Sequence, residues 1–323
     1  MKRWSPGRVV RLLVATTLTA VVLWKANPAA VVRTAAHAGL RWILLALALT
    51  AFDRVLMAYR WLVLLCPLDD ADRPPFRAVM RVFFTSTFVG TFLPGGGADL
   101  VRAYGLSRLN VPAGRALASV LMDRLLGVLA IVLVGIAGLL LAGGRGVRSN
   151  WTIELAFLAA ASGCAAGGLV VFSAGVAGLV QRISERLPLA AVRRVAGDVT
   201  QATRAYAAYH RELAIVLTGS VSVQILRILQ AYCLGRALSI DAPLAVYFAF
   251  VPLILLIILL PVSINGIGTA QVAFVWFFSR AATPQAQAFA LSVLFLALGV
   301  VGNLPGGFLY ASKNISRNVP RPV

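Results

Sequence analysis

Apolar runs long enough to cross a bilayer alternate with short polar segments along most of the chain. About 20 predominantly apolar residues span the hydrocarbon core as a helix. One run ends near residue 24, and others occupy residues 42–65, 116–142, 151–180, 213–234 and 287–310. The pattern therefore predicts six full spans. A cleaved signal peptide is the alternative for the first run, and Lys25, beside the would-be cleavage region, favours an uncleaved span.

Two further apolar segments are too short to span and are interrupted by proline and glycine. Residues 81–97 end in a Pro-Gly-Gly-Gly sequence, and residues 246–280 are broken at Pro261 and again at Gly266 and Gly268. Broken helices are tolerated at membrane depth only where they face protein or a water-filled cavity. Both segments are therefore predicted to be re-entrant helical elements. Two ordinary kinked helices are the alternative.

Composition excludes a soluble globular fold. Of the 323 residues, 60% are hydrophobic and 13% are charged, and the mean hydropathy is +0.86. A soluble chain averages about 25% charged residues. The 30 Lys and Arg outnumber the 11 Asp and Glu, which gives a net charge of +19. Because the basic residues gather in short loops between apolar runs, they indicate the positive-inside rule and anionic lipid, and no nucleic-acid partner is expected.

The distribution of basic residues also predicts a topology. It favours both termini in the cytoplasm, in a multi-pass protein of a bacterial inner membrane. The two short elements then enter the membrane from opposite sides, which gives two halves of inverted topology, as in many secondary transporters. The expected fold is an all-α polytopic membrane protein, with about six full spans and two re-entrant helical elements in an inverted repeat.

We expect a single transmembrane domain, residues 1–323, in five parts. These are an N-terminal span and loop (1–40), a first half (41–180) with the element 81–97, a cytoplasmic amphipathic segment (181–212), a second half (213–312) with the element 246–280, and a basic cytoplasmic tail (313–323). The amphipathic segment is rich in arginine and is expected to lie on the membrane surface.

The first break is the strongest local motif for a binding site. Proline and glycines leave backbone amides free at the start of the following helix, where an anionic headgroup is stabilised. Asp99 and Arg102 follow at a spacing of three, on one helical face. The predicted headgroup site comprises Pro94, Gly95, Gly96, Gly97, Asp99 and Arg102. A cytoplasmic loop with a capping aspartate is the alternative.

Charged residues also interrupt the predicted spans. A charge at the centre of a membrane helix costs about 2.5–3.5 kcal/mol on insertion scales, so such residues face the bundle interior and pair. Asp123 and Arg124 point about 100° apart on a helix and are not expected to pair with each other. The predicted intramembrane charge partners are Asp53, Arg54, Arg60, Arg102 and Arg227. A static structural ion pair is the alternative to a role in lining a cavity.

The remaining motifs point away from catalysis. The second break offers hydrogen bonds without charge, at Asn265, Gly266, Gly268 and Gln271. The motifs GxxxxGK[ST] and GxSxG are absent, so neither ATP hydrolysis nor a nucleophilic serine is indicated. The two histidines stand alone, and the three cysteines are far apart. We therefore expect no catalytic residue, no metal, no cofactor and no enzyme activity.

Three motifs together resemble the lysylphosphatidylglycerol synthase transmembrane-region family, which comprises flippase-like integral membrane proteins. They are residues 92–102 (FLPGGGADLVR), residues 118–127 (ASVLMDRLLG), and Leu260-Pro261 followed by Gly266-Ile267-Gly268. The resemblance runs over nearly the whole chain and implies a helical flippase fold that moves a lipid headgroup between leaflets. By this resemblance, Asp99, Arg102, Asp123 and Arg124 line or brace the cavity.

The sequence departs from the family pattern in two ways. It lacks the soluble synthase domain, so a stand-alone member is expected and no aminoacyl transfer is implied. At the second glycine motif the family usually has Arg-Glu or similar, and this chain has Ala270 and Gln271. The change removes a carboxylate, which argues against recognition of a cationic aminoacyl headgroup.

The residues and the resemblance together predict a lipid flippase or transporter that works by alternating access without ATP hydrolysis. The expected partners are membrane lipids (an anionic phospholipid, a hopanoid or a glycolipid), with a lipid-biosynthesis enzyme or a second copy of the chain as further partners. The alternative is a non-transporting accessory subunit of a lipid-modifying glycosyltransferase or of a hopanoid or glycolipid pathway. A membrane-embedded enzyme ranks last, because only Asp99 and Asp123 could supply its acid–base chemistry.

Overall fold

The computed structural model describes residues 38–65, 67, 74–93, 97–143, 151–173, 190–260 and 266–312, with a few isolated positions between 174 and 189. These residues form helices joined by short turns, and no strand occurs among them. The predicted first span, the basic tail and the site residues Pro94, Gly95, Gly96 and Asn265 lie outside the described residues.

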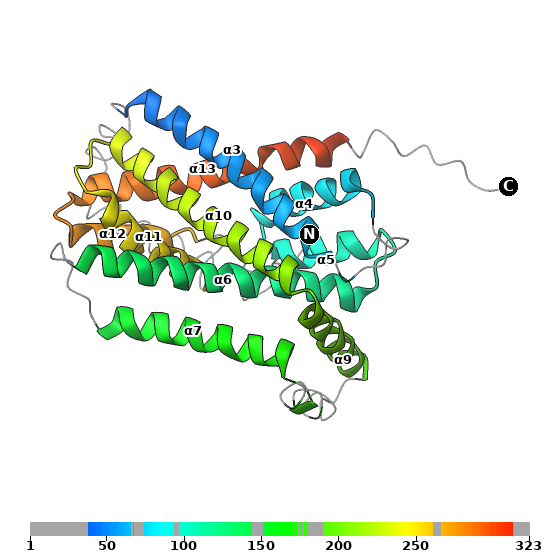
Figure 1. The fold of residues 1–323 in the computed structure, drawn as a ribbon. Helices are drawn as coiled ribbons and strands as arrows, with labels where there is room; N and C mark the ends of the chain where they lie inside the picture. Colours follow the sequence, from blue (N-terminus) through cyan, green and yellow to red (C-terminus); the bar gives the residue numbers. More distant parts are fainter. Residues whose placement is uncertain are drawn as a thin grey trace, which may run out of the picture.

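The described helices are arranged as a bundle with two pairs of short helices (Figure 1). In chain order they are α3 (Leu40–Val63), α4 (Phe76–Gly90), α5 (Gly97–Ser107), α6 (Ala113–Gly143), α7 (Trp151–Phe172), α9 (Ala190–Ala205), the 3-10 turn η1 (Tyr206–Ala208), α10 (His210–Ala237), α11 (Leu244–Leu259), α12 (Thr269–Ser279) and α13 (Gln285–Ser312).

Four helices are long and apolar enough to cross a membrane. They are Leu40–Val63, Ala113–Leu141, His210–Ala237 and Gln285–Tyr310, in α3, α6, α10 and α13. They agree with the spans predicted at 42–65, 116–142, 213–234 and 287–310. The span predicted at 151–180 corresponds to α7, whose 22 residues end earlier, at Phe172. The chain is thus a helical membrane protein, and the full count of six spans stays a prediction.

Both predicted breaks occur, and each separates two short helices. α4 ends at Gly90 and α5 begins at Gly97, while α11 ends at Leu259 and α12 begins at Thr269. A Cβ on Gly90 would collide with Ala98, so only glycine lets the end of α4 approach the start of α5 this closely. At the second break, Gly266 and Gly268 have φ of 77° and 87°, a left-handed backbone that favours glycine.

The first short element is longer than predicted. Residues 81–97 cover only part of α4 and the break, whereas the helix resumes and continues to Ser107. α5 contains Asp99, Arg102 and two glycines, so its apolar pattern is too weak to predict how far the expected helix extends. The second element, 246–280, agrees with α11 and α12 to within two residues at each end.

The long helices α3 and α10 run antiparallel along each other. The Gly39 amide before α3 donates a hydrogen bond to the Ala237 carbonyl at the end of α10 (2.8 Å), whereas Arg60 near the end of α3 bonds Ser220 near the start of α10 (2.9 Å). α6 packs on α11, and α13 packs on α4. As a result α4 and α5 lie toward one end of the long helices, and α11 and α12 lie toward the other (Figure 1).

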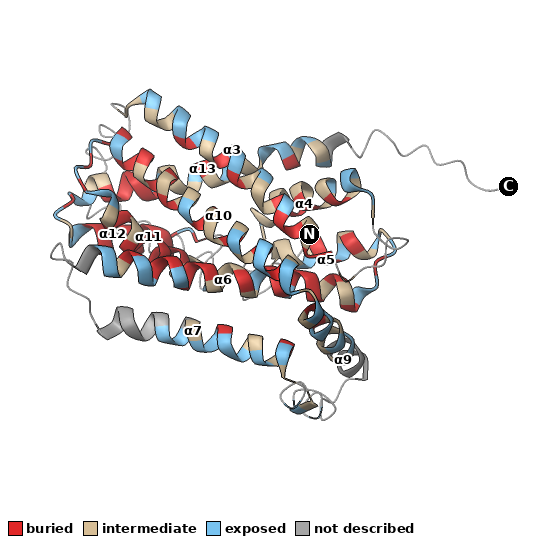
Figure 2. Cartoon of the chain, viewed as in Figure 1, coloured by how far each residue is buried: buried red, intermediate tan, exposed pale blue. Residues whose placement is uncertain are grey.

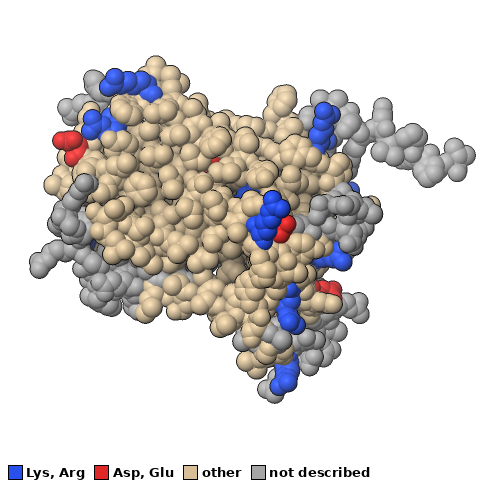
Figure 3. Space-filling model, in the orientation of Figure 1, with Lys and Arg blue, Asp and Glu red and all other residues tan. Residues whose placement is uncertain are grey.

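Burial and charge fit a membrane setting. Buried residues lie between the helices of the bundle, and α7 packs outside α6 with mostly exposed side chains (Figure 2). The face in Figure 3 is largely uncharged across its middle, and most of its charged residues lie toward the two ends of the long helices. Leu44, Leu140 and Leu304 on three candidate spans are exposed. An apolar band of this kind faces lipid.

The amphipathic segment predicted at 181–212 contains α9, which carries Arg193, Arg194 and Arg204 and packs against α6 and α7. Figure 1 shows α9 at an angle to the long helices, at the end of the bundle where α6 begins. The segment ends sooner than predicted, because η1 follows α9 and α10 begins at His210.

Two glycines let long helices approach the short ones. A Cβ on Gly138 of α6 would collide with the Phe248 carbonyl oxygen of α11, and a Cβ on Gly306 of α13 would collide with the Phe84 carbonyl oxygen of α4. Small residues at such contacts are typical of helix packing in membranes. These two contacts hold α11 against α6 and α4 against α13.

Gly306→Ala is expected to lower the thermal unfolding midpoint of the protein in detergent, because the added methyl group must move α13 away from the α4 backbone. Overpacking of this kind costs about 1–3 kcal/mol. Gly299→Ala in the same helix is the control, since its Cβ would meet nothing within 4 Å and alanine favours helix over glycine. An unchanged midpoint for Gly306→Ala would contradict the close contact.

Candidate functional site

A cavity of about 360 Å³ lies inside the bundle, between α3, α4, α5, α6, α10, α11 and α13. Its volume falls in the lower part of the range for small-molecule pockets, about 300–1,000 Å³. All the charged residues predicted for the site line it, namely Asp53, Arg54, Arg60, Asp99, Arg102, Asp123, Arg124 and Arg227. Four helices thus bring together charges that are far apart in the sequence.

Asp123 on α6 is shared by two buried arginines. Its Oδ1 accepts a hydrogen bond from Arg60 Nη2 at 2.6 Å, and its Oδ2 accepts one from Arg102 Nη1 at 3.2 Å. Arg60 Nη1 also donates to the Ser220 hydroxyl at 2.9 Å. None of the three charged side chains is more than 9% exposed. One carboxylate therefore links α3, α5 and α6, and through Ser220 also α10.

Aromatic rings complete the surroundings of Arg102. Its guanidinium carbon lies 5.3 Å from the centroid of the Trp61 ring and 4.8 Å from that of the Phe83 ring. A cation within about 6 Å of an aromatic face is stabilised, and more strongly when it is desolvated. The protein itself thus supplies most of what stabilises the Arg102 charge, although the Arg102 Nε has no hydrogen-bond partner.

A second ion pair lies at the edge of the cavity, beside the first break. Arg124 Nε donates to Asp99 Oδ2 at 2.7 Å. The Arg124 side chain is 45% exposed, against 17% for Asp99. The neighbours Asp123 and Arg124 thus take different partners, as their separation around the helix predicted. This pair is more exposed than the two pairs of Asp123, so of these ion pairs it opens the most easily.

Asp53, Arg54 and Arg227 form a third cluster, near the middle of α3 and α10. Asp53 Oδ2 lies 3.7 Å from Arg54 Nη1, and Asp53 Oδ1 lies 3.7 Å from Arg227 Nε. Both separations are too long for hydrogen bonds. Arg54 Nη1 and Arg227 Nη2 instead approach the Met57 sulfur, at 3.5 and 3.3 Å. Because a thioether is a weak acceptor, this cluster is paired in charge but poor in hydrogen bonds.

Several polar residues of the cavity were missed in the sequence: Thr87, Thr91, Gln224, Gln230 and Asn303. Gln224, Arg227 and Gln230 recur every three residues within one span, a helical face that the sequence could have revealed. Asn303 Nδ2 donates to Thr91 Oγ1 at 2.9 Å and ties α13 to α4. Nothing in the sequence separates Asn303 from an ordinary polar residue near a helix end.

Charged and apolar residues both line the cavity. The charged residues come from α3, α5, α6 and α10. Apolar residues come from the end of α11 and from α13, namely Leu255, Ile258, Leu259, Leu260, Phe295 and Leu296, and also from the helices that carry the charges, namely Met57, Val128, Ile131 and Val223. The cavity is therefore amphipathic.

The second break contributes less to the cavity than predicted. Gly266 lines it, whereas Gly268 and Gln271 do not. Gln271 Oε1 accepts a hydrogen bond from the Gly268 amide at 2.6 Å and so caps the start of α12. Gln271 is therefore a structural residue in this arrangement. At the first break, Leu93 and Gly97 line the cavity on either side of the undescribed residues.

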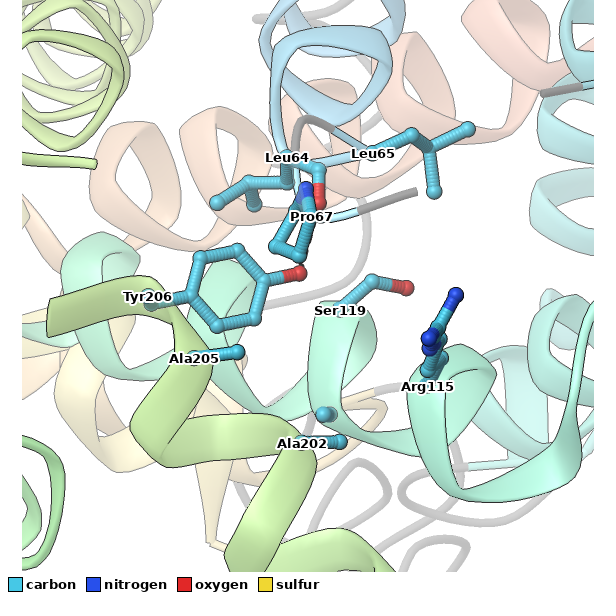
Figure 4. Close-up of a pocket in the computed structure, with 9 residues that line it drawn as sticks. Leu64, Leu65, Pro67, Arg115, Ser119, Ala202, Ala205 and Tyr206 are labelled. Carbon is cyan, nitrogen blue, oxygen red and sulfur yellow. Dashed lines mark hydrogen bonds between the residues drawn. The ribbon is translucent and has the colours of Figure 1, made fainter. Parts of the chain in front are cut away.

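Other candidate sites among the described residues are weaker. A separate pocket of about 70 Å³ lies where the end of α3 meets α6 and α9. The Tyr206 ring lies across it, and its hydroxyl donates to the Leu64 carbonyl oxygen at 2.6 Å (Figure 4). This pocket has room for a few water molecules only. No group of three or more His, Cys, Asp and Glu that could hold a metal occurs in the described part of the chain.

Apolar helices long enough to span a membrane, packed around a charged cavity, define a polytopic helical membrane protein. Comparison with known families identifies the family to which it belongs. The chain belongs to the lysylphosphatidylglycerol synthase TM region family, whose model matches residues 8–306. The resemblance carried by the two glycine breaks and by Asp123-Arg124 is thereby confirmed. No match is found among the curated proteins.

Asp123→Asn is expected to destabilise the protein strongly, because it leaves Arg60 and Arg102 buried without a counter-charge. Breaking a buried ion pair from one side costs about 3–5 kcal/mol. Asp241→Asn is the matched control, since Asp241 is fully exposed and lies 3.5 Å from Arg236. Thermal unfolding in detergent measures both. If the two variants unfold at the same temperature, the Asp123 network does not hold the helices together.

Proposed function

We propose that the protein moves a polar or anionic lipid between the leaflets of the inner membrane by alternating access, without ATP hydrolysis. The observation that carries the proposal is the cavity, which is lined by both charged and apolar residues, within a bundle of helices long and apolar enough to span a membrane. A lipid has the same two parts. Membership of a family named for the transmembrane region of a lipid synthase supports a lipid-related function.

The headgroup binds against the arginines of the cavity, and the acyl chains contact the apolar residues of α11 and α13. The Asp99–Arg124 pair is partly exposed, so the cavity reaches the surface beside α5 and α6. An anionic group entering there meets the start of α5, where backbone amides favour negative charge. Arg124 then exchanges Asp99 for the headgroup.

Alternating access requires two halves that exchange roles, and the packing supports an inverted repeat. α3, α4, α5 and α6 correspond in order to α10, α11, α12 and α13. Under this correspondence the α6–α11 contact becomes α13–α4, the α5–α6 contact becomes α12–α13, and both members of each pair occur. The corresponding helices α3 and α10 run antiparallel. Rocking of one half against the other exposes the cavity to each leaflet in turn.

The proposed orientation, with α9 and both termini in the cytoplasm, is tested by cysteine accessibility. In a variant whose native cysteines are replaced by serine, Arg204→Cys on the exposed face of α9 should react with a membrane-impermeant maleimide only after the membrane is permeabilised. Arg280→Cys, just beyond α12 at the opposite end of the bundle, should react without permeabilisation. The reverse pattern would overturn the orientation.

Transport is tested with the purified protein in proteoliposomes that contain lipids with a fluorescent acyl chain, by chemical quenching of the outer leaflet. The protein should accelerate exchange of at least one lipid class over empty vesicles. Gly127→Leu should abolish the acceleration, because Gly127 lines the cavity and its Cβ would have room to project beside Arg60. Gly163→Leu on α7 is the control, since no atom lies within 4 Å of its Cβ.

Two outcomes would reject the proposal. In the first, the wild type moves no lipid class faster than empty vesicles do. In the second, Gly127→Leu folds normally by its thermal midpoint and still transports, in which case the cavity is not the path. Stable co-purification with a lipid-modifying glycosyltransferase, together with the first outcome, would favour the accessory-subunit hypothesis.

A further inference from the structure

We propose that the cavity selects lipids whose headgroup carries a phosphate monoester, and that this doubly charged phosphate binds between Arg54 and Arg227. The inference rests on the proposed function, because it names the class of lipid that the same cavity takes. It differs from the substrate that the family description suggests, because a lysylated headgroup carries a net positive charge.

The first step is the charge balance of the cavity. Its described lining contains five arginines and three aspartates, and no lysine, histidine or glutamate. The lining therefore has an excess of two positive charges. Such an excess inside a low-dielectric bundle favours an anion of matching charge and repels a cation. A phosphate monoester carries about −1.5 to −2 at pH 7, whereas a phosphate diester carries one negative charge.

The second step is the location of the weakest hydrogen bonding. The excess divides equally, because Arg60 and Arg102 share Asp123, Arg54 and Arg227 share Asp53, and Arg124 is balanced by Asp99. Arg60, Arg102 and Arg124 each donate a hydrogen bond to a carboxylate. Arg54 and Arg227 lie 3.7 Å from Asp53 and otherwise approach only a carbonyl oxygen at 3.4 Å and the Met57 sulfur. These two are therefore the arginines of the described lining that lack a hydrogen-bonded carboxylate.

Unpartnered polar atoms around the same cluster point to a ligand. Two buried donors, Arg54 Nε and Gln230 Nε2, have no hydrogen-bond partner. Asp53 Oδ1 and Gln224 Oε1 are also unpartnered, but they are acceptors and need a donor from another group. All four residues line the cavity. Two guanidinium groups match a phosphate well, because each offers parallel N–H donors to two oxygens. A phosphate between them supplies acceptors for donors that have no hydrogen-bond partner in the protein, and the Gln230 amide adds another donor.

The cavity volume limits the rest of the headgroup. At about 360 Å³ the cavity lies near the lower bound for ligand pockets, and charged side chains form part of its lining. It accommodates a phosphate with a small polar group, and the acyl or prenyl chains leave along its apolar residues. Phosphatidic acid and a polyprenyl phosphate share this chemistry, and both serve as probes.

The test compares lipids of different headgroup charge with the wild-type protein. Exchange in proteoliposomes should be fastest for phosphatidic acid and polyprenyl phosphate, slower for phosphatidylglycerol, and slowest for phosphatidylcholine and lysylphosphatidylglycerol. A polyprenyl phosphate that moves while phosphatidic acid does not would identify the prenyl chain as a second determinant. In detergent, short-chain phosphatidic acid should raise the thermal midpoint more than short-chain phosphatidylglycerol does.

Variants separate charge selection from folding. Arg227→Gln should slow phosphatidic acid exchange about ten- to a hundredfold, the effect of one lost charge-assisted contact. The double variant R54Q/R227Q should exchange phosphatidic acid and phosphatidylcholine equally. Asp53→Asn should increase the thermal shift produced by phosphatidic acid, since it adds to the positive excess. If the cluster had only a structural role, all three variants would instead lose the thermal shift produced by phosphatidic acid. Arg236→Gln, on the same helix but outside the cavity, is the control.

The outcomes distinguish this inference from the proposed function. If the wild type moves lipids but prefers zwitterionic or lysylated headgroups, or shows no preference, the charge selection is wrong and the flippase proposal stands. If it moves no lipid, the flippase proposal is wrong, and the thermal shifts alone decide whether a phosphate monoester binds. A shift equal for phosphatidic acid and phosphatidylglycerol would overturn the binding site as well.

Discussion

The carboxylate of Asp123, shared by Arg60 and Arg102, is the interaction on which the arrangement of the bundle depends. The three side chains come from three helices and are almost fully buried. In a membrane, each of these charges would face hydrocarbon if it had no partner, and a lone charge there is costly. The helices α3, α5 and α6 are therefore held at one mutual position, and α5 is fixed beside the break that precedes it.

That network engages some of the charged residues that line the cavity and leaves others available to a ligand. Arg60 follows Asp53 by seven positions on α3, which is about two helical turns or about 10 Å along the axis. The cavity thus has two levels of charge on the same helical face. At the Arg60 level, both arginines donate hydrogen bonds to Asp123, although the Nε atoms of Arg60 and Arg102 have no partner. At the Asp53 level, neither arginine has a hydrogen-bonded carboxylate. A mobile anion therefore competes for donors more readily at the second level than at the first.

Much of this architecture could be predicted from the sequence, because length and hydropathy determine which helices span a bilayer. The breaks and the intramembrane charges were also predictable, since proline, glycine and charge are rare at membrane depth and conspicuous there. Which of these charges pair with one another could not be predicted. Asp123 could have paired with any of four arginines, because hydropathy carries no information on which helices are neighbours. A helix after the first break was expected, with Asp99 and Arg102 on one face, but its extent to Ser107 could not be predicted, because its charged residues weaken its apolar pattern.

Under the proposed correspondence of α3–α6 with α10–α13, the two sets of helices differ in chemistry. The third residue of α5 is Asp99, which pairs with Arg124, and the third residue of α12 is Gln271, which caps its own helix. Seven of the eight charged residues of the cavity come from α3, α5 and α6, and only Arg227 comes from the second set. If the two sets rock against each other as proposed, the headgroup moves with the first set. The second set then supplies apolar residues of α11 and α13 that contact the lipid chains, together with Arg227, whose distance from Arg54 changes with the motion. A phosphate bound between these two arginines would couple its own release to that motion.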